Sequence, residues 1–134
     1  MDRETLLALA ERVEKATGPD RELDRLIAPL VGIRVVEEGH PLGRCYYDEN
    51  GHGVPLPLFT ASLDAAMTLV PEGYEFAVGT GRKEHMTENG RKPWAWCATG
   101  SDLVDGLSLS ATPALALTAA CLRSLAATSK GSAS

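Results

Sequence analysis

Hydrophobic residues in the first thirty positions recur every three or four residues, the period of a helix with one buried face. Residues 2–16 carry one such stripe and residues 20–30 carry a second. Gly18 and Pro19 separate the stripes, because glycine suits a helix C-terminus and proline lacks the N–H that would continue it. We expect two antiparallel helices. The stripe of the first is formed by Leu6, Leu9, Ala10, Val13 and Thr17, and that of the second by Leu23, Leu26, Ile27 and Leu30.

The middle of the chain changes to short runs of β-branched and aromatic residues bounded by turn-forming residues, which is typical of strands. This pattern predicts strands at residues 33–37, 44–48, 74–78 and 94–98, with a short strand or edge at 103–104 and 107–109. Between the second and third strands, Thr60 is suited to cap a helix over residues 61–70. The inward face of this helix is expected to be Leu63, Ala66, Met67 and Val70.

The last helix is expected over residues 113–125, with Thr112 as its cap and Pro113 in its first turn. Nearly all its side chains are small or apolar, so it should lie in the middle of the structure. The order ααββαββα predicts the α+β class and a single-domain three-layer α/β/α sandwich with a largely antiparallel sheet. This domain spans residues 1–126, and residues 127–134 are expected to form a frayed tail.

Three segments of the chain resemble the blocks that mark small phage and prophage proteins of the phage ABA sandwich domain family. They are LAERVEKATGPDRELD at residues 9–24, TASLDAAMTLVPEG at residues 60–73 and ATPALAL at residues 111–117. The resemblance implies an α-β-α sandwich and a phage origin. It implies no activity, because the family is one of unknown function. Each block also has a structural explanation in helix caps and packed apolar faces.

Composition excludes several classes of function. The 134 residues include 18 acidic and 13 basic side chains, giving a net charge of −5, which argues against binding duplex DNA. No apolar run reaches the length of a membrane span, and the first residues do not resemble a signal peptide. Three widely spaced cysteines favour a reduced cytoplasmic setting.

Catalytic signatures are weak. His40 and Cys45 lie five positions apart, but the paired spacing of a metal site is missing. Cys97 and Cys121 fall in apolar segments, where a thiol is usually a small buried side chain. The stretch from Gly79 to Lys83 lacks the spacing of a phosphate-binding loop. We therefore expect no catalytic residue, no metal ligand and no cofactor. The residues favour a protein that is not an enzyme over one that is.

One basic segment stands out in this acidic protein. Residues 1–75 contain 14 acids and 7 bases, whereas residues 76–134 contain 4 acids and 6 bases. Four of the six bases fall within residues 82–92, in an expected long loop that ends at two tryptophans on one strand face. Cationic side chains bind phosphate oxygens, and an indole stacks on a base. The candidate ligand-binding residues are Thr80, Arg82, Lys83, His85, Arg91, Lys92, Trp94 and Trp96.

Two functional hypotheses follow, beside the plainer reading of a solvated loop and an accessory domain. In the first, a phage protein in the host cytoplasm sequesters a cyclic or short nucleotide signal of host defence without turnover. In the second, the protein inhibits a host defence protein by docking through acids of the helical hairpin, namely Glu11, Glu14, Asp20, Glu22, Asp24 and Glu37. The unequal charge of the two halves also suggests a homodimer.

Overall fold

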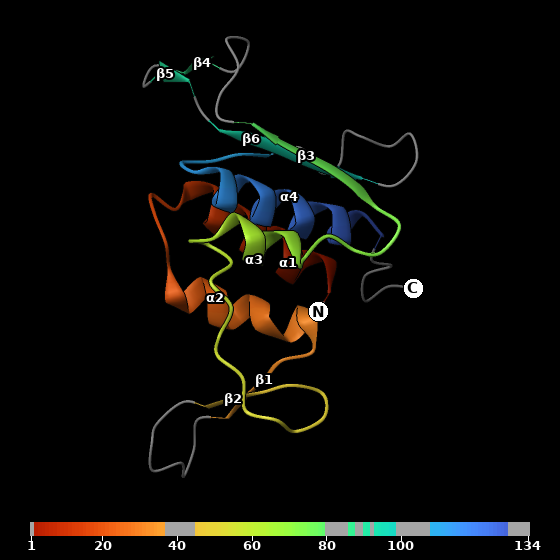
Figure 1. Ribbon diagram of the computed structural model, residues 1–134. Helices are drawn as coiled ribbons and strands as arrows, with labels where there is room; N and C mark the ends of the chain where they lie inside the picture. The colour runs from red at the N-terminus through yellow and green to blue at the C-terminus, as the bar shows by residue number, and fades with distance from the viewer. Residues whose placement is uncertain are drawn as a thin grey trace.

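The computed structural model describes residues 2–36, 45–79, 86–87, 90–91, 93–98 and 108–128 (Figure 1). Helices and short antiparallel strands are both present, as expected for the α+β class. In chain order the elements are α1 (Arg3–Lys15), α2 (Arg21–Ile27), the 3-10 helix η1 (Ala28–Val31), β1 (Arg34–Val36), β2 (Cys45–Tyr47), α3 (Leu63–Met67), β3 (Glu75–Gly79), β4 (Met86–Thr87), β5 (Gly90–Arg91), β6 (Trp94–Ala98), β7 (Ser108–Leu109) and α4 (Pro113–Thr128).

The two N-terminal helices form as the apolar pattern predicts, and each is capped by an aspartate. The Asp2 side chain accepts a hydrogen bond from the Thr5 N–H. Hydrogen bonding with the Thr5 side chain, and then with this N–H, lowers the pKa of Asp2. Asp20 caps α2 in the same way. The second helix ends earlier than expected, because Pro29 lies in the 3-10 turn η1 that follows it. Gly32 closes that turn with a φ of 79°.

Helix α4 lies at the centre of the structure, which confirms the prediction from its composition. Leu117, Cys121 and Leu122 are fully buried. One side of α4 packs on α1 and α3, and the other side packs on β6 (Figure 1). Thr112 caps α4 as predicted, since its hydroxyl accepts from the Leu115 N–H. The helix includes residues 127 and 128 of the predicted tail, and residues 129–134 lie outside the described residues.

The strands differ from the single sheet that the sequence predicts. In the part of the chain that the structure describes, β3, β6 and β7 form one antiparallel sheet in the order β3-β6-β7, while β1–β2 and β4–β5 are separate pairs. All four α-helices lie on one side of the β3-β6-β7 sheet (Figure 1). The described residues therefore do not confirm a three-layer sandwich. The separate β1–β2 pair has a physical reason, because η1 and Gly32 lead the chain away from α4.

Helix α3 is shorter than predicted, and two of the four residues predicted for its inward face point outward. Its cap is Ser62, whose side chain accepts from the Ala65 N–H, and the helix ends at Met67. Ala66 is buried and Val70 packs against the core, as predicted, whereas Leu63 and Met67 are 36% and 42% exposed. Leu63 and Met67 lie four residues apart and so share one face of the helix, which points outward.

Strand β7 joins the sheet to the end of α1. The buried Ser110 hydroxyl lies just after β7 and contacts the carbonyl oxygens of Val13 at 3.1 Å and Glu14 at 3.2 Å. These carbonyls belong to the last turn of α1, where helix acceptors lack a partner within the helix. The predicted strand at residues 107–109 is thus confirmed for 108–109, and residues 99–107 lie outside the described residues.

Candidate functional site

The predicted basic loop is partly a hairpin rather than a plain loop. Strands β4 and β5 pair antiparallel, with Met86 opposite Arg91. They extend beyond the end of the β3–β6 pair (Figure 1). Arg91 is thereby placed on β5. The other polar residues predicted for this site lie outside the described residues, namely Thr80, Arg82, Lys83, His85 and Lys92.

The two tryptophans lie on the face of the sheet that points away from α4. Ala95 and Cys97 alternate with them along β6 and are buried. Trp94 and Trp96 are each partly exposed. Since successive residues of a strand point to opposite faces, both indoles share the outer face. The prediction that they point the same way agrees with this geometry.

Small residues on the neighbouring strand make room for the indoles. Trp94 pairs with Gly79 and Trp96 pairs with Ala77 across the β3–β6 register. A Cβ built on Gly79 would lie 2.4 Å from the Trp94 ring, so this indole lies across the glycine backbone. Sequence reasoning missed this pairing. The sequence does contain a signal for this pairing. Small residues occupy positions 77 and 79 of β3, and the large residues Trp94 and Trp96 occupy β6 at the same spacing.

The outer face of the sheet is therefore apolar over most of its length. Its apolar part consists of Ala77, Gly79, Trp94, Trp96 and Leu109, the last paired with Trp94 from β7, and the exposed Glu75 lies on the same face at the start of β3. None of the described helices covers it (Figure 1). Base rings stack on such aromatic surfaces with little dependence on sequence. At one end of this surface the chain continues from Gly79 into residues 80–92, which are basic by sequence.

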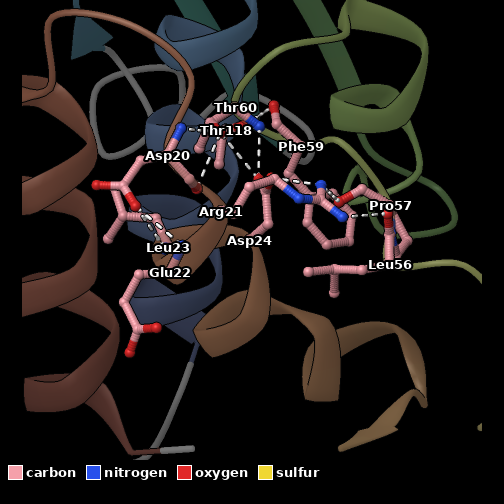
Figure 2. Close-up of polar contacts among 10 residues, drawn as sticks. All are labelled: Asp20, Arg21, Glu22, Leu23, Asp24, Leu56, Pro57, Phe59, Thr60 and Thr118. Carbon is pink, nitrogen blue, oxygen red and sulfur yellow. Dashed lines mark hydrogen bonds and ion pairs between the residues drawn. The ribbon is translucent and has the colours of Figure 1, made fainter. Parts of the chain in front are cut away.

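A second cluster of polar side chains is internal to the fold. Asp24 is fully buried and accepts from the Thr60 N–H at 2.8 Å and the Thr60 hydroxyl at 2.9 Å (Figure 2). Arg21 contacts the other Asp24 carboxylate oxygen at 2.8 Å and donates to the carbonyl of Leu56. The buried Thr118 hydroxyl donates to the carbonyl of Phe59. These bonds fix residues 56–60 against α2 and α4.

The acids of the helical hairpin are mostly engaged within the protein. Glu14 on α1 pairs with Arg123 on α4, and this contact raises the pKa of Arg123. Asp20 caps α2, and Glu22 pairs with Arg25. Asp24 is buried, so its predicted role in docking is wrong. Of the remaining two acids, Glu11 is exposed, and Glu37 lies outside the described residues.

The cysteines give no sign of a reactive thiol. Cys97 and Cys121 are both fully buried, as their apolar surroundings predict. The hydrogen bond from the Cys121 thiol lowers the pKa of Cys97, and the same contact together with burial raises the pKa of Cys121. Cys45 is partly exposed. Among the described residues, no three His, Cys, Asp or Glu side chains gather as a metal site would require.

A membrane span is not found in the described part of the chain, where each helix is too short or too polar to cross a bilayer.

Comparison with known proteins finds no matching family model, and no curated protein or solved structure matches the chain. Arguments about function therefore rest on the residues themselves.

Proposed function

We propose that this protein is a small phage-encoded binding protein that holds a phosphate-bearing nucleotide signal without turning it over. The observation that carries the proposal is the pair of indoles on the sheet face that no described helix covers, next in sequence to a basic segment. The phage origin rests on the resemblance of residues 9–24, 60–73 and 111–117 to phage sandwich proteins. Sequestration of a host immune signal in the host cytoplasm is the counter-defence role that fits such a protein.

The ligand in this proposal stacks a base on the outer face of the sheet and directs its phosphates to the basic segment. Trp94 and Trp96 supply the stacking surface. The phosphate contacts come from Arg82, Lys83, Arg91 and Lys92, with Thr80 and His85 as further polar partners. Charge-assisted contacts contribute about 1.5–3 kcal/mol each, so three or four of them with one stacked base support sub-micromolar affinity. Neither a metal nor a catalytic group enters this binding.

Docking on a host defence protein through the helical hairpin is the alternative. The internal contacts of Glu14, Asp20, Glu22 and Asp24 weaken it, because these carboxylates are already bonded within the protein. A homodimer and the three-layer sandwich remain predictions, and nucleotide binding at Trp94 and Trp96 requires that any third layer leave the outer sheet face open. Light scattering that gives a single 14.2 kDa species across micromolar concentrations would exclude the dimer.

Intrinsic fluorescence tests the nucleotide proposal directly, because Trp94 and Trp96 are the chain's two tryptophans. Cyclic di- and trinucleotides and ADP-ribose-type compounds should be screened for quenching and for an increase in Tm. A ligand that binds only the folded state stabilises it by about 2.7 kcal/mol at a hundredfold excess over Kd. No quenching and no shift at ligand concentrations far above a micromolar would reject the proposal.

Variants then place the ligand. Trp96→Ala should weaken binding about fivefold to a hundredfold, the range expected for loss of one stacked base. Arg82→Ala and Arg91→Ala should each weaken it about tenfold or more. Arg12→Ala on α1 is the matched control, since Arg12 is an exposed cation far along the chain from this segment, and it should leave binding unchanged.

A further inference from the structure

The indole of Trp94 lies closer to β3 than any residue except glycine would allow at position 79. Trp94 is the first residue of β6 and pairs with Gly79, the last residue of β3. A Cβ on Gly79 would lie 2.4 Å from both Nε1 and Cε2 of the indole and 2.6 Å from Cζ2. Near-equal distances to three bonded neighbours place this Cβ position above the plane of the ring, not at its edge. The ring therefore meets the glycine backbone with one of its faces.

The contact leaves Trp94 with one face against β3 and the other directed away from it. Trp94 is partly exposed, and no described helix packs on this side of the sheet (Figure 1). Trp96 differs, because the residue that pairs with it is Ala77, whose Cβ occupies the corresponding space. Of the two indoles, Trp94 is thus the one that can lie across the neighbouring strand at this distance.

Charge gives a nucleotide on the outer sheet face a direction. The exposed Glu75 lies on this face at the start of β3, at the opposite end from Gly79. Residues 80–92, which are basic by sequence, follow Gly79 and precede Trp94 in the chain. A carboxylate repels phosphate, and cationic side chains attract it. The phosphate is therefore expected at the end of the face where Gly79 pairs with Trp94.

We propose that Gly79 is a positioning residue for Trp94, and that the outward face of this indole stacks a purine base. The inference rests on the proposed nucleotide function, because it names the base that Trp94 takes and the residue that orients Trp94. Stacking strengthens as the overlap of the rings grows, and a two-ring purine covers an indole more fully than a one-ring pyrimidine does. An aromatic ring over a strand glycine also stabilises a sheet, so the experiment has to separate orientation from stability.

The experiment uses the full chain and two probes that differ only in their base, adenosine 5′-monophosphate (AMP) and uridine 5′-monophosphate (UMP). Trp94 and Trp96 are the chain's two tryptophans, so ¹H–¹⁵N NMR shows two indole N–H peaks, which Trp96→Phe assigns. AMP should shift the Trp94 peak more than the Trp96 peak, through the ring current of the stacked base. UMP should bind about threefold more weakly or worse.

Gly79→Ala tests the positioning step, first without ligand and then with it. The added Cβ displaces the indole, so the Trp94 peak should move in the ligand-free protein. Binding of AMP should weaken about fivefold or more, as expected when a stacked base is lost. Gly18→Ala is the matched control, because an added Cβ there has no atom within 4 Å. It should change neither indole peak and leave the Kd for AMP unaltered.

Trp94→Ala separates orientation from stability. In this background Gly79→Ala has no ring to displace, so it should weaken AMP binding by at most about twofold further. If Gly79 only stabilised the sheet, Gly79→Ala would weaken AMP binding equally with and without the indole, and that result would overturn the proposal. Loss of the fold in Gly79→Ala that Trp94→Ala does not repair would overturn it as well.

The remaining outcomes distinguish this inference from the proposed function. AMP that binds with the same Kd before and after Gly79→Ala would leave the nucleotide function standing and reject positioning by Gly79. UMP that binds as tightly as AMP would reject the purine. AMP that shifts neither indole peak would reject the purine stack. The proposed function would fail with it only if the cyclic nucleotides and the ADP-ribose-type compounds also do not bind.

Discussion

The α1–α2 side of the molecule and the outer face of the sheet use their chemistry in opposite ways. On the helical side, polar groups face inward and bond to one another, as Asp24 does with Thr60 and Arg21. On the outer sheet face, large apolar rings lie partly exposed, and none of the described helices packs on them. Groups already bonded within the fold contribute stability, whereas exposed groups remain available to a ligand. Charge counted along the sequence does not separate these two cases.

The sharpest test of this comparison is Asp24→Ala. Removal of the carboxylate leaves the buried Thr60 N–H and hydroxyl without their acceptor, and it leaves Arg21 without its partner. We expect a loss of about 4 kcal/mol in the free energy of unfolding, measured by urea denaturation. Asp24→Asn should lose less, because an amide oxygen can still accept from Thr60. A loss below about 1 kcal/mol for Asp24→Ala would show that the cluster contributes little to stability.

Leu117→Ala tests the core that the helical side shares with the sheet. Leu117 is fully buried on α4, so its truncation should create a cavity and cost about 3 kcal/mol. Met67→Ala on α3 is the control, because Met67 is a large apolar side chain that is 42% exposed. Thermal melts followed by circular dichroism should show a large decrease in Tm for the first variant and a small one for the second. Similar decreases would contradict the outward orientation of Met67.

The elements predicted best are those whose pattern and caps are local. The bounds of α1, the Thr112 cap of α4 and the central position of α4 follow from residues within one helix. The start of α3 was predicted wrongly, because Ser62 and Thr60 are both acceptable caps and only packing decides between them. Leu63 and Met67 were also wrongly placed on its inward face. Thr60 is instead buried against Asp24, 36 residues earlier, and no local signal indicates such a contact.

The candidate site likewise has features that local sequence predicts and features that depend on distant parts of the chain. Alternation along one strand was enough to predict that Trp94 and Trp96 share a face. Sequence alone could not predict that this face lacks a covering helix in the described structure, because the expected sandwich placed helices on both sides. For a related reason, the sequence did not show that acids of the helical hairpin are bonded within the protein. Glu14 is an ordinary surface acid by its pattern, and Arg123, which binds it, lies 109 residues later.

Glu14→Gln measures how much the ion pair between one acid of the helical hairpin and Arg123 contributes to the free energy of unfolding. The Glu14–Arg123 pair joins α1 to α4 through two contacts, one of them 2.9 Å between Arg123 Nε and Glu14 Oε2. Both side chains are more than two-thirds buried, so we expect a loss of about 1 kcal/mol in unfolding free energy. Glu11→Gln, three residues earlier on the same helix, should change it by only a few tenths of a kcal/mol. Equal losses would mean that the pair adds nothing beyond general charge.

The smallest expected effect has the opposite sign and concerns the inner face of the sheet. Ser108 is 3% exposed on β7, and its hydroxyl has no hydrogen-bond partner among the described residues. Burial of an unbonded hydroxyl costs free energy, so Ser108→Ala should stabilise the protein by up to about 1 kcal/mol. Ser110→Ala is the matched change two residues later. It removes the hydroxyl that bonds the last turn of α1 and should destabilise the protein by about 1 kcal/mol. Urea denaturation of both variants decides the point. A loss of stability for Ser108→Ala would mean that this hydroxyl is bonded in solution, and the inner sheet face would then have the same fully bonded character as the Asp24 cluster.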